Sequence, residues 1–196
     1  NRIALGAAEV SPLNMANAYA TLADSGKRKD VHFVAKVVDR NGNTVYEAKK
    51  EGTQAIEENV AANVTDALTS VVEEEGGTGA KASALNRPVA GKTGTNGVDD
   101  SITSAWFVGY TRQISTAVMY VAGDSGNENL DAYKKPGDKT FFGSGYPLTT
   151  WVEYMQTATK GQEVKQLDKA KPIQGKSSAP SQAPTRSAQP TSAQPT

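Results

Sequence analysis

The residues best suited to chemistry form one short run, Lys92-Thr93-Gly94-Thr95, which follows Val89-Ala90-Gly91. Lysine supplies positive charge, a threonine hydroxyl donates a hydrogen bond, and glycine lets a ligand lie close to the backbone. On a strand, these residues would bind a carboxylate, and a backbone N–H just beyond them would stabilise an oxyanion. One such donor is worth about 3–4 kcal/mol in acyl transfer. Taken alone, the run equally fits a solvated strand end with an exposed lysine.

A phosphate-binding loop is the second chemistry that this run suggests. Gly91-Lys92-Thr93 matches the end of the pattern G-x-x-x-x-G-K-[ST]. That pattern requires glycine at position 86, where the chain has Asn86, and it must open a helix. The residues that follow, Asn96-Gly97-Val98-Asp99-Asp100, predict a turn instead. The sequence therefore argues against nucleotide binding.

Composition excludes several other functions. The 21 basic residues are balanced by 21 acidic ones without a basic block, which argues against nucleic-acid binding. The absence of cysteine excludes disulfides, zinc–thiolate sites and a cysteine nucleophile. His32, the single histidine, lies in the predicted strand Val31–Val38 and fits an ordinary strand residue better than a triad base. We expect no metal and no cofactor. No apolar run reaches the ~18 residues of a membrane span, and no signal peptide is visible.

The elements that would position Lys92–Thr95 are predicted from periodicity and from helix and turn signals. Ser11-Pro12 favours a helix start and Gly26 its end. Asn41-Gly42 favours a hairpin. The remaining predictions are a hairpin of strands 31–38 and 44–48, a helix over 57–74, strands over 87–93, 105–110 and 114–122, and a last helix after Pro147. The apolar stripe of the helix over 57–74 would comprise Val60, Val64, Ala67, Leu68, Val71 and Val72.

These elements predict a mixed α/β (α+β) fold, in which an antiparallel sheet is flanked by helices. Trp106 and Tyr110 would share one face of their strand and Phe107 would pack on the other. The expected folded domain spans residues 1–159. Residues 160–196 hold five of the nine prolines among Ser, Ala, Gln and Thr, and we expect a disordered tail there.

Three segments in the same order resemble class A penicillin-binding proteins. They are the run from Ala4 to Ala23 (ALGAAEVSPLNMANAYATLA), the run AGKTGT of residues 90–95 followed by AWFVGYT of residues 105–111, and GSGYPLTTW of residues 143–151. The resemblance spans about residues 3–157, and it identifies Lys92-Thr93-Gly94 as the third motif of a serine transpeptidase. The implied fold is part of a penicillin-binding, serine β-lactamase-like transpeptidase domain.

In that family a serine attacks the D-Ala-D-Ala bond of a peptidoglycan stem peptide, D-Ala leaves, and an amine of a second stem peptide accepts the acyl group. β-Lactams acylate the same serine. The resemblance implies that Lys92 and Thr93 contact substrate, that Gly94 gives substrate access to the strand, and that Thr95 supplies an oxyanion-hole amide. Its hydroxyl would also reach the substrate carboxylate. The implied location is the outer face of the bacterial cell membrane.

The chain departs from the family at the nucleophile. No serine has lysine three positions later, although the family motif is S-x-x-K. Ser125-Gly126-Asn127 spells the second motif, S-x-N, but follows Lys92–Gly94 where the family places it before, so we treat it as a chance match. We therefore expect a piece of a longer protein. The serine, its lysine, the second motif, a glycosyltransferase domain and the membrane anchor would lie upstream, and this piece alone would be inactive. A non-catalytic peptidoglycan-binding or sensing domain remains the alternative.

Overall fold

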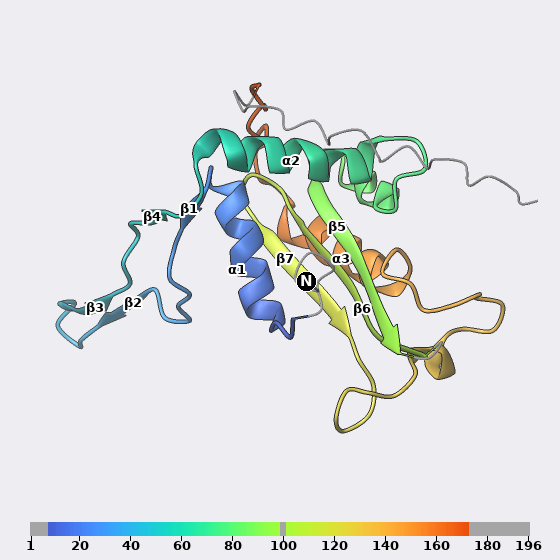
Figure 1. The fold of residues 1–196 in the computed structure, drawn as a ribbon. Coiled ribbons are helices and arrows are strands. Elements are labelled where there is room, and N and C mark those ends of the chain that lie inside the picture. Colours follow the sequence, from blue (N-terminus) through green and yellow to red (C-terminus); the bar gives the residue numbers. More distant parts are fainter. Residues whose placement is uncertain (1–7, 99–100, 173–196) are drawn as a thin grey trace, which may run out of the picture.

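A three-stranded antiparallel sheet forms the centre of the computed structural model, which describes residues 8–98 and 101–172. Its strands are β5 (Ala90–Val98), β6 (Ser101–Tyr110) and β7 (Ser115–Tyr120), in the order β5-β6-β7 (Figure 1). Since β6 is central, β5 is an edge strand among the described residues. The antiparallel sheet with flanking helices confirms the fold class that the sequence predicts.

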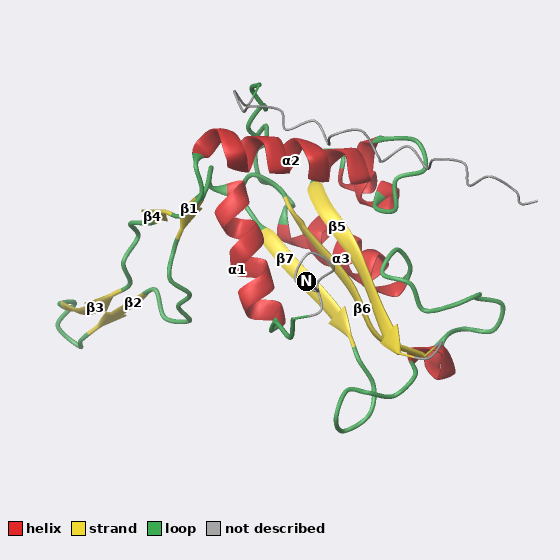
Figure 2. Cartoon of the chain, viewed as in Figure 1, coloured by secondary structure: helices red, strands yellow, loops and turns green. Residues whose placement is uncertain are grey.

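Two helices cover opposite faces of this sheet (Figure 2). Helix α1 (Pro12–Ala23) packs on one face, where the rings of Tyr19 and Tyr110 meet edge to face at 6.0 Å. Helix α3 (Tyr146–Ala158) packs on the other, where Phe107 meets Trp151 at 5.1 Å. Successive β6 side chains therefore enter two different cores. The prediction that Phe107 is a core residue is confirmed, since its side chain is fully buried.

The ends of α1 follow the signals in the sequence. The Ser11 hydroxyl accepts a hydrogen bond from the Asn14 N–H at 3.2 Å, and Pro12 occupies the first turn. Gly26, at φ +83°, donates its N–H to the Thr21 carbonyl at 2.8 Å. Glycine suits this position because it tolerates a positive φ without strain.

Helix α2 (Glu58–Glu73) lies across one end of the sheet, against β5 (Figure 1). Its existence is confirmed, but the predicted apolar stripe is partly wrong. Val60 and Val64 are 37% and 39% exposed, whereas the buried positions are Ala61, Ala62, Thr65 and Val72. Small side chains allow a close approach to the sheet, and the Thr65 hydroxyl hydrogen-bonds the Tyr110 phenol at 2.8 Å.

An arm leaves the domain between α1 and α2. It consists of the hairpin β2 (Lys36–Val38) and β3 (Thr44–Glu47), carried on the short pair β1 (Lys27–Arg28) and β4 (Thr53–Gln54). The predicted turn is confirmed, with Gly42 at φ +85°. The prediction that the strand begins at Val31 is wrong: pairing ends near Ala35, so residues 31–34 have no strand opposite them. His32 is exposed, with Nδ1 3.3 Å from the Asp30 carbonyl oxygen.

Strand β5 also differs from its prediction. It begins at Ala90 instead of Arg87, and Asn96–Val98 continue the strand where a turn was expected. The reason is that β6 starts early, at Ser101, and offers partners to these residues across a bulge between Asn96 and Gly97. The expected turn residues Asp99 and Asp100 lie outside the described residues. Two short helices, η2 (Ala80–Leu85) and η3 (Leu130–Tyr133), were not predicted.

Beyond α3, residues 160–172 run back along the domain, although the sequence assigned them to a tail. Leu167 packs beside Tyr19 and Tyr110, and Asn63 of α2 donates to the Lys171 carbonyl at 2.9 Å. Contacts with the body therefore extend at least to Lys171. Residues 173–196, the remainder of the expected tail, lie outside the described residues. Within the described part, no helix is both long and apolar enough to cross a membrane.

Candidate functional site

Lys92-Thr93-Gly94-Thr95 lies within β5, at the edge of the described sheet (Figure 1). Lys92 pairs with Val108 and Gly94 with Trp106, while Thr93 pairs with Phe107. Because side chains alternate along a strand and directly opposed residues share a face, Lys92 and Gly94 belong to the α1 face. Thr93 and Thr95 belong to the α3 face. The run therefore presents groups on both sides of one strand edge.

The Lys92 side chain is exposed and folds back on its own strand. Its ammonium group donates to the Thr93 carbonyl at 3.0 Å and lies 3.4 Å from the Thr93 hydroxyl. Among the ion pairs formed by the described residues, none includes Lys92. Its positive charge is thus available to an anionic ligand at the same place as the Thr93 hydroxyl.

Two further contacts hold the threonines. The Thr93 hydroxyl lies 3.0 Å from the hydroxyl of Thr78, which belongs to the turn after α2. The Thr95 hydroxyl accepts a hydrogen bond from the Gly143 N–H at 3.1 Å. Residues from before and after the sheet in sequence therefore converge on β5.

Close approach requires glycine at position 143 and leaves little space for a side chain at position 94. A Cβ on Gly94 would lie 3.3 Å from the Cβ of Trp106, which is tighter than ordinary packing. A Cβ on Gly143 would lie 2.5 Å from the Gly94 carbonyl oxygen and closer still to that of Trp106. Gly143 thus packs directly on the backbone of Gly94, and this part of β5 is supported from the α3 face.

Sequence reasoning missed Thr78 and the packing role of Gly143. Thr78 stands in the run Gly76-Gly77-Thr78-Gly79, whose glycines indicated only a helix end. Gly143 lies in the segment of residues 143–151 that resembles the family, but the sequence predicted no contact for it. Neither contact is local, since 15 and 48 residues separate the partners. The one sequence feature that could have indicated the Thr78 contact is the glycine-rich composition of residues 76–79.

Ser125-Gly126-Asn127 lies in an exposed turn after β7, where the Gly126 N–H donates to the Gly123 carbonyl at 3.1 Å. None of the hydrogen bonds or ion pairs among the described residues joins this turn to Lys92–Thr95, and the chance match stays a prediction. Among residues 8–98 and 101–172, no group of three or more His, Cys, Asp or Glu side chains is arranged to hold a metal ion.

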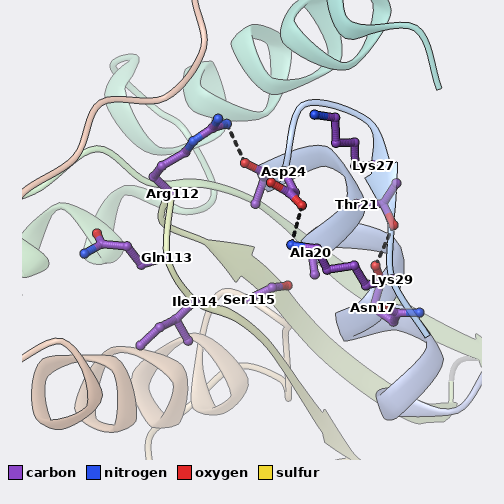
Figure 3. Close-up of a pocket in the computed structure, with 11 residues that line it drawn as sticks. Asn17, Ala20, Thr21, Asp24, Lys27, Lys29, Arg112, Gln113, Ile114 and Ser115 are labelled. Atoms are coloured by element: carbon purple, nitrogen blue, oxygen red, sulfur yellow. Dashed lines mark hydrogen bonds and ion pairs between the residues drawn. The ribbon is translucent and has the colours of Figure 1, made fainter. Parts of the chain in front are cut away.

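A pocket of about 230 Å³ lies elsewhere, between the C-terminal end of α1 and the turn from β6 to β7 (Figure 3). Its charged lining comes from Asp24, Lys27, Lys29 and Arg112. Arg112 donates to the Ala23 carbonyl at 2.6 Å, and Lys29 pairs with Asp24 at 2.8 Å. These charges are largely satisfied within the protein, and no residue of Lys92–Thr95 lines the pocket. The candidate site is instead an open strand edge.

Comparison with known proteins gives consistent matches. The penicillin binding protein transpeptidase domain family matches residues 2–142. Penicillin-binding protein 1A of Mycolicibacterium smegmatis is 37% identical over 188 residues, which cover 94% of this chain and 23% of that protein. The chain thus spans about a quarter of the length of this relative.

Solved structures agree with the sequence matches. The penicillin-binding protein PonA1 from Mycobacterium tuberculosis superposes with a TM-score of 0.77 at 35% identity, covering 100% of this chain and 50% of that one. The same protein in complex with penicillin V gives a TM-score of 0.75 at 36% identity, over 88% and 44% of the two chains. The fold and the sequence point to the same set of proteins.

Proposed function

Because the chain belongs to the penicillin-binding protein transpeptidase family, we propose that it forms one wall of a peptidoglycan D,D-transpeptidase active site. The observation that carries the proposal is the placement of Lys92-Thr93-Gly94-Thr95 on an accessible edge strand, with the Lys92 ammonium beside the Thr93 hydroxyl. The reaction is acyl transfer from a D-Ala-D-Ala stem peptide to an amine, through a serine ester.

Lys92 and Thr93 bind the carboxylate of the donor peptide or of a β-lactam. Lysine attracts the anion, and the threonine hydroxyl donates a hydrogen bond to it. Hydrogen bonds that involve a charged group contribute about 1.5–3 kcal/mol each. Gly94 keeps the adjoining strand surface open to substrate.

Thr95 donates its backbone N–H to the oxyanion of the tetrahedral intermediate. The Lys92 ammonium reaches the Thr93 carbonyl, so this carbonyl is accessible from the strand edge. Backbone groups two residues apart along a strand point in the same direction. The Thr95 N–H therefore shares this direction, and a donor fixed before reaction stabilises the oxyanion without reorganisation. The Thr95 hydroxyl, held by the Gly143 N–H, is a further donor toward the substrate carboxylate.

The nucleophile, its S-x-x-K lysine and the S-x-N motif are supplied by polypeptide that precedes residue 1. The 196 residues contain no S-x-x-K sequence. The chain covers 50% of the PonA1 structure and 23% of the M. smegmatis relative, so much of each of these proteins lies outside the matched region and could contain those motifs. A glycosyltransferase domain and a membrane anchor belong to the same preceding part. Catalysis then takes place at the outer face of the bacterial membrane.

We further propose a domain organisation in which residues 1–159 complete the transpeptidase domain and residues 160–196 form a C-terminal tail, whose first residues, as far as Lys171, pack back on the domain. The Ser-, Pro-, Ala-, Gln- and Thr-rich composition from Gln174 onward supports the second part, because such a segment has little apolar surface to bury.

Fluorescent penicillin tests this function. The complete protein should form a covalent adduct that survives denaturing electrophoresis, and residues 1–196 expressed alone should form none. A stable adduct on the isolated chain would disprove the proposal that the nucleophilic serine lies outside residues 1–196. A folded complete protein without any adduct would favour a peptidoglycan-binding module of the same fold.

A further inference from the structure

The turn after α2 brings one hydroxyl group to the candidate site from outside β5. The Thr78 hydroxyl lies 3.0 Å from the Thr93 hydroxyl, and both side chains are within reach of solvent. Thr78 belongs to none of the segments in which the sequence showed a resemblance. Its contact is with the same threonine that is proposed to bind the substrate carboxylate.

The turn that carries Thr78 is folded against the C-terminal end of α2. The Gly79 N–H donates to the Val71 carbonyl at 2.9 Å, and the Gly77 N–H donates to the Glu74 carbonyl at 3.0 Å. A Cβ on Gly77 would lie 3.0 Å from the Glu74 carbonyl oxygen and closer to that of Val71. Both glycines therefore pack closely on the end of α2, and these contacts place Thr78, which lies between them, beside Thr93 of β5.

The contact with Thr78 limits where the Thr93 hydroxyl proton can point. The Thr93 hydroxyl has one proton to donate and two lone pairs that accept. The Lys92 ammonium, which only donates, lies 3.4 Å from this oxygen. If Thr78 donates to the other lone pair, the Thr93 proton cannot point at either neighbour and is directed outward.

We propose that Thr78 is a positioning residue for transpeptidation: its hydroxyl donates to Thr93 and orients the Thr93 proton toward the substrate carboxylate. The inference rests on the proposed function, because it concerns the same carboxylate-binding group. Thr78 itself does not contact the reacting atoms. Its contribution is to remove the alternative in which Thr93 donates its proton to Thr78 and presents only lone pairs to an anion.

The test compares acylation of the complete protein by a penicillin and by the methyl ester of the same penicillin. Thr78→Val keeps the shape of the side chain and removes its hydroxyl. Acylation by the free acid should slow roughly three- to tenfold, the equivalent of one neutral hydrogen bond. Acylation by the ester should change much less, because the ester lacks the anion that Thr93 recognises. Thr78→Ser should restore the rate with the free acid.

Thr69→Val is the matched control, since it removes a hydroxyl from α2 that donates only to the Thr65 carbonyl. An equal loss with acid and ester in Thr78→Val would overturn the proposal, because it would indicate a structural effect. An unchanged rate with the free acid, or a failure of Thr78→Ser to restore it, would also overturn it. Lys92→Ala distinguishes a failure of the Thr78 proposal from a failure of the proposed function. If Lys92→Ala slows acylation while Thr78→Val does not, only the role of Thr78 is wrong. If neither slows acylation, the proposed function fails.

Discussion

Arg112 and Asp168 form an ion pair at 2.8 Å, with 27% and 38% of their side chains exposed. Arg112 lies in the turn from β6 to β7, and Asp168 lies in the segment that follows α3. The same guanidinium donates to the Ala23 carbonyl at the end of α1 and to the Ser25 hydroxyl, which in turn donates to Asp168. One arginine thus joins the sheet, α1 and residues 160–172 on the side of the domain shown in Figure 3.

Breaking this network should lower the stability of the domain by a modest amount. Arg112→Ala removes the ion pair and leaves the Ala23 carbonyl without its donor, so we expect a loss of about 1–2 kcal/mol in the free energy of unfolding. Asp168→Asn should cost less, since an amide still accepts from Ser25. Lys50→Ala, which breaks the exposed pair with Glu47, is the control and should lie within about 0.5 kcal/mol of wild type. Urea unfolding measures the free energy of unfolding of all three variants. Equal losses in the three would contradict a stabilising role for the Arg112 network.

Tyr110 makes stability depend on alkaline pH. Burial raises the pKa of its phenol to about 12, and the hydrogen bond between this phenol and the Thr65 hydroxyl opposes that shift only in part. The unfolded chain ionises first, near pH 10, so the stabilisation is fully present below pH 10. It is lost as pH rises through 12, on the order of 2 kcal/mol over this range.

Tyr110→Phe should abolish most of this dependence, while costing about 1 kcal/mol at neutral pH through the lost hydrogen bond. The measurement is the pH dependence of Tm between pH 9 and about pH 11 for both proteins. Parallel curves for wild type and variant would show that another group is responsible.

Two phenylalanines provide a test of where the core lies. Phe107 is fully buried against Trp151, and we expect Phe107→Ala to cost about 3–5 kcal/mol. Phe33, on the arm, is 87% exposed, and Phe33→Ala should change the free energy of unfolding by less than about 0.5 kcal/mol. Chemical denaturation of both variants tests the difference. A large loss for Phe33→Ala would mean that the arm is packed in the complete protein.

We expect a side chain at Gly143 to slow acylation by displacing β5. Gly143→Ala places a methyl group against the carbonyl oxygens of Gly94 and Trp106, so the strand must shift. We expect slower acylation of the complete protein by penicillin, with a smaller effect on Tm than Phe107→Ala. Ser144→Ala, which adds no atoms next to this glycine, should acylate normally. Wild-type acylation in Gly143→Ala would show that β5 tolerates displacement at Gly94.

Local signals in the sequence were enough to find most helices and strands. The Ser11 cap and the glycine turn at Gly42 report short-range chemistry, which the sequence contains in full. The predicted ends of strands were wrong where pairing with another strand decides them. Residues 31–34 have the composition of a strand but no partner strand, whereas Asn96–Val98 have the composition of a turn but pair with β6.

The candidate site was predictable only in part for the same reason. Lys92–Thr95 could be recognised as a run and by resemblance, and this resemblance is confirmed at the level of the family. The contacts of Thr93 with Thr78 and of Thr95 with Gly143 depend on how α2 and the loop before α3 pack on β5. Such contacts between distant segments leave no periodic signature. On α2, likewise, the small residues that pack closely are buried in place of Val60 and Val64.

The most direct test of the central claim is the rate constant for acylation by penicillin of Lys92→Ala in the complete protein. The lost charge and hydrogen bond should slow acylation about tenfold or more, with Tm and circular dichroism unchanged because the side chain is exposed. Lys81→Ala, at an exposed lysine of η2, should react like wild type. A folded Lys92→Ala variant that is acylated at the wild-type rate would contradict the assignment of Lys92-Thr93-Gly94-Thr95 as the carboxylate-binding wall of the site.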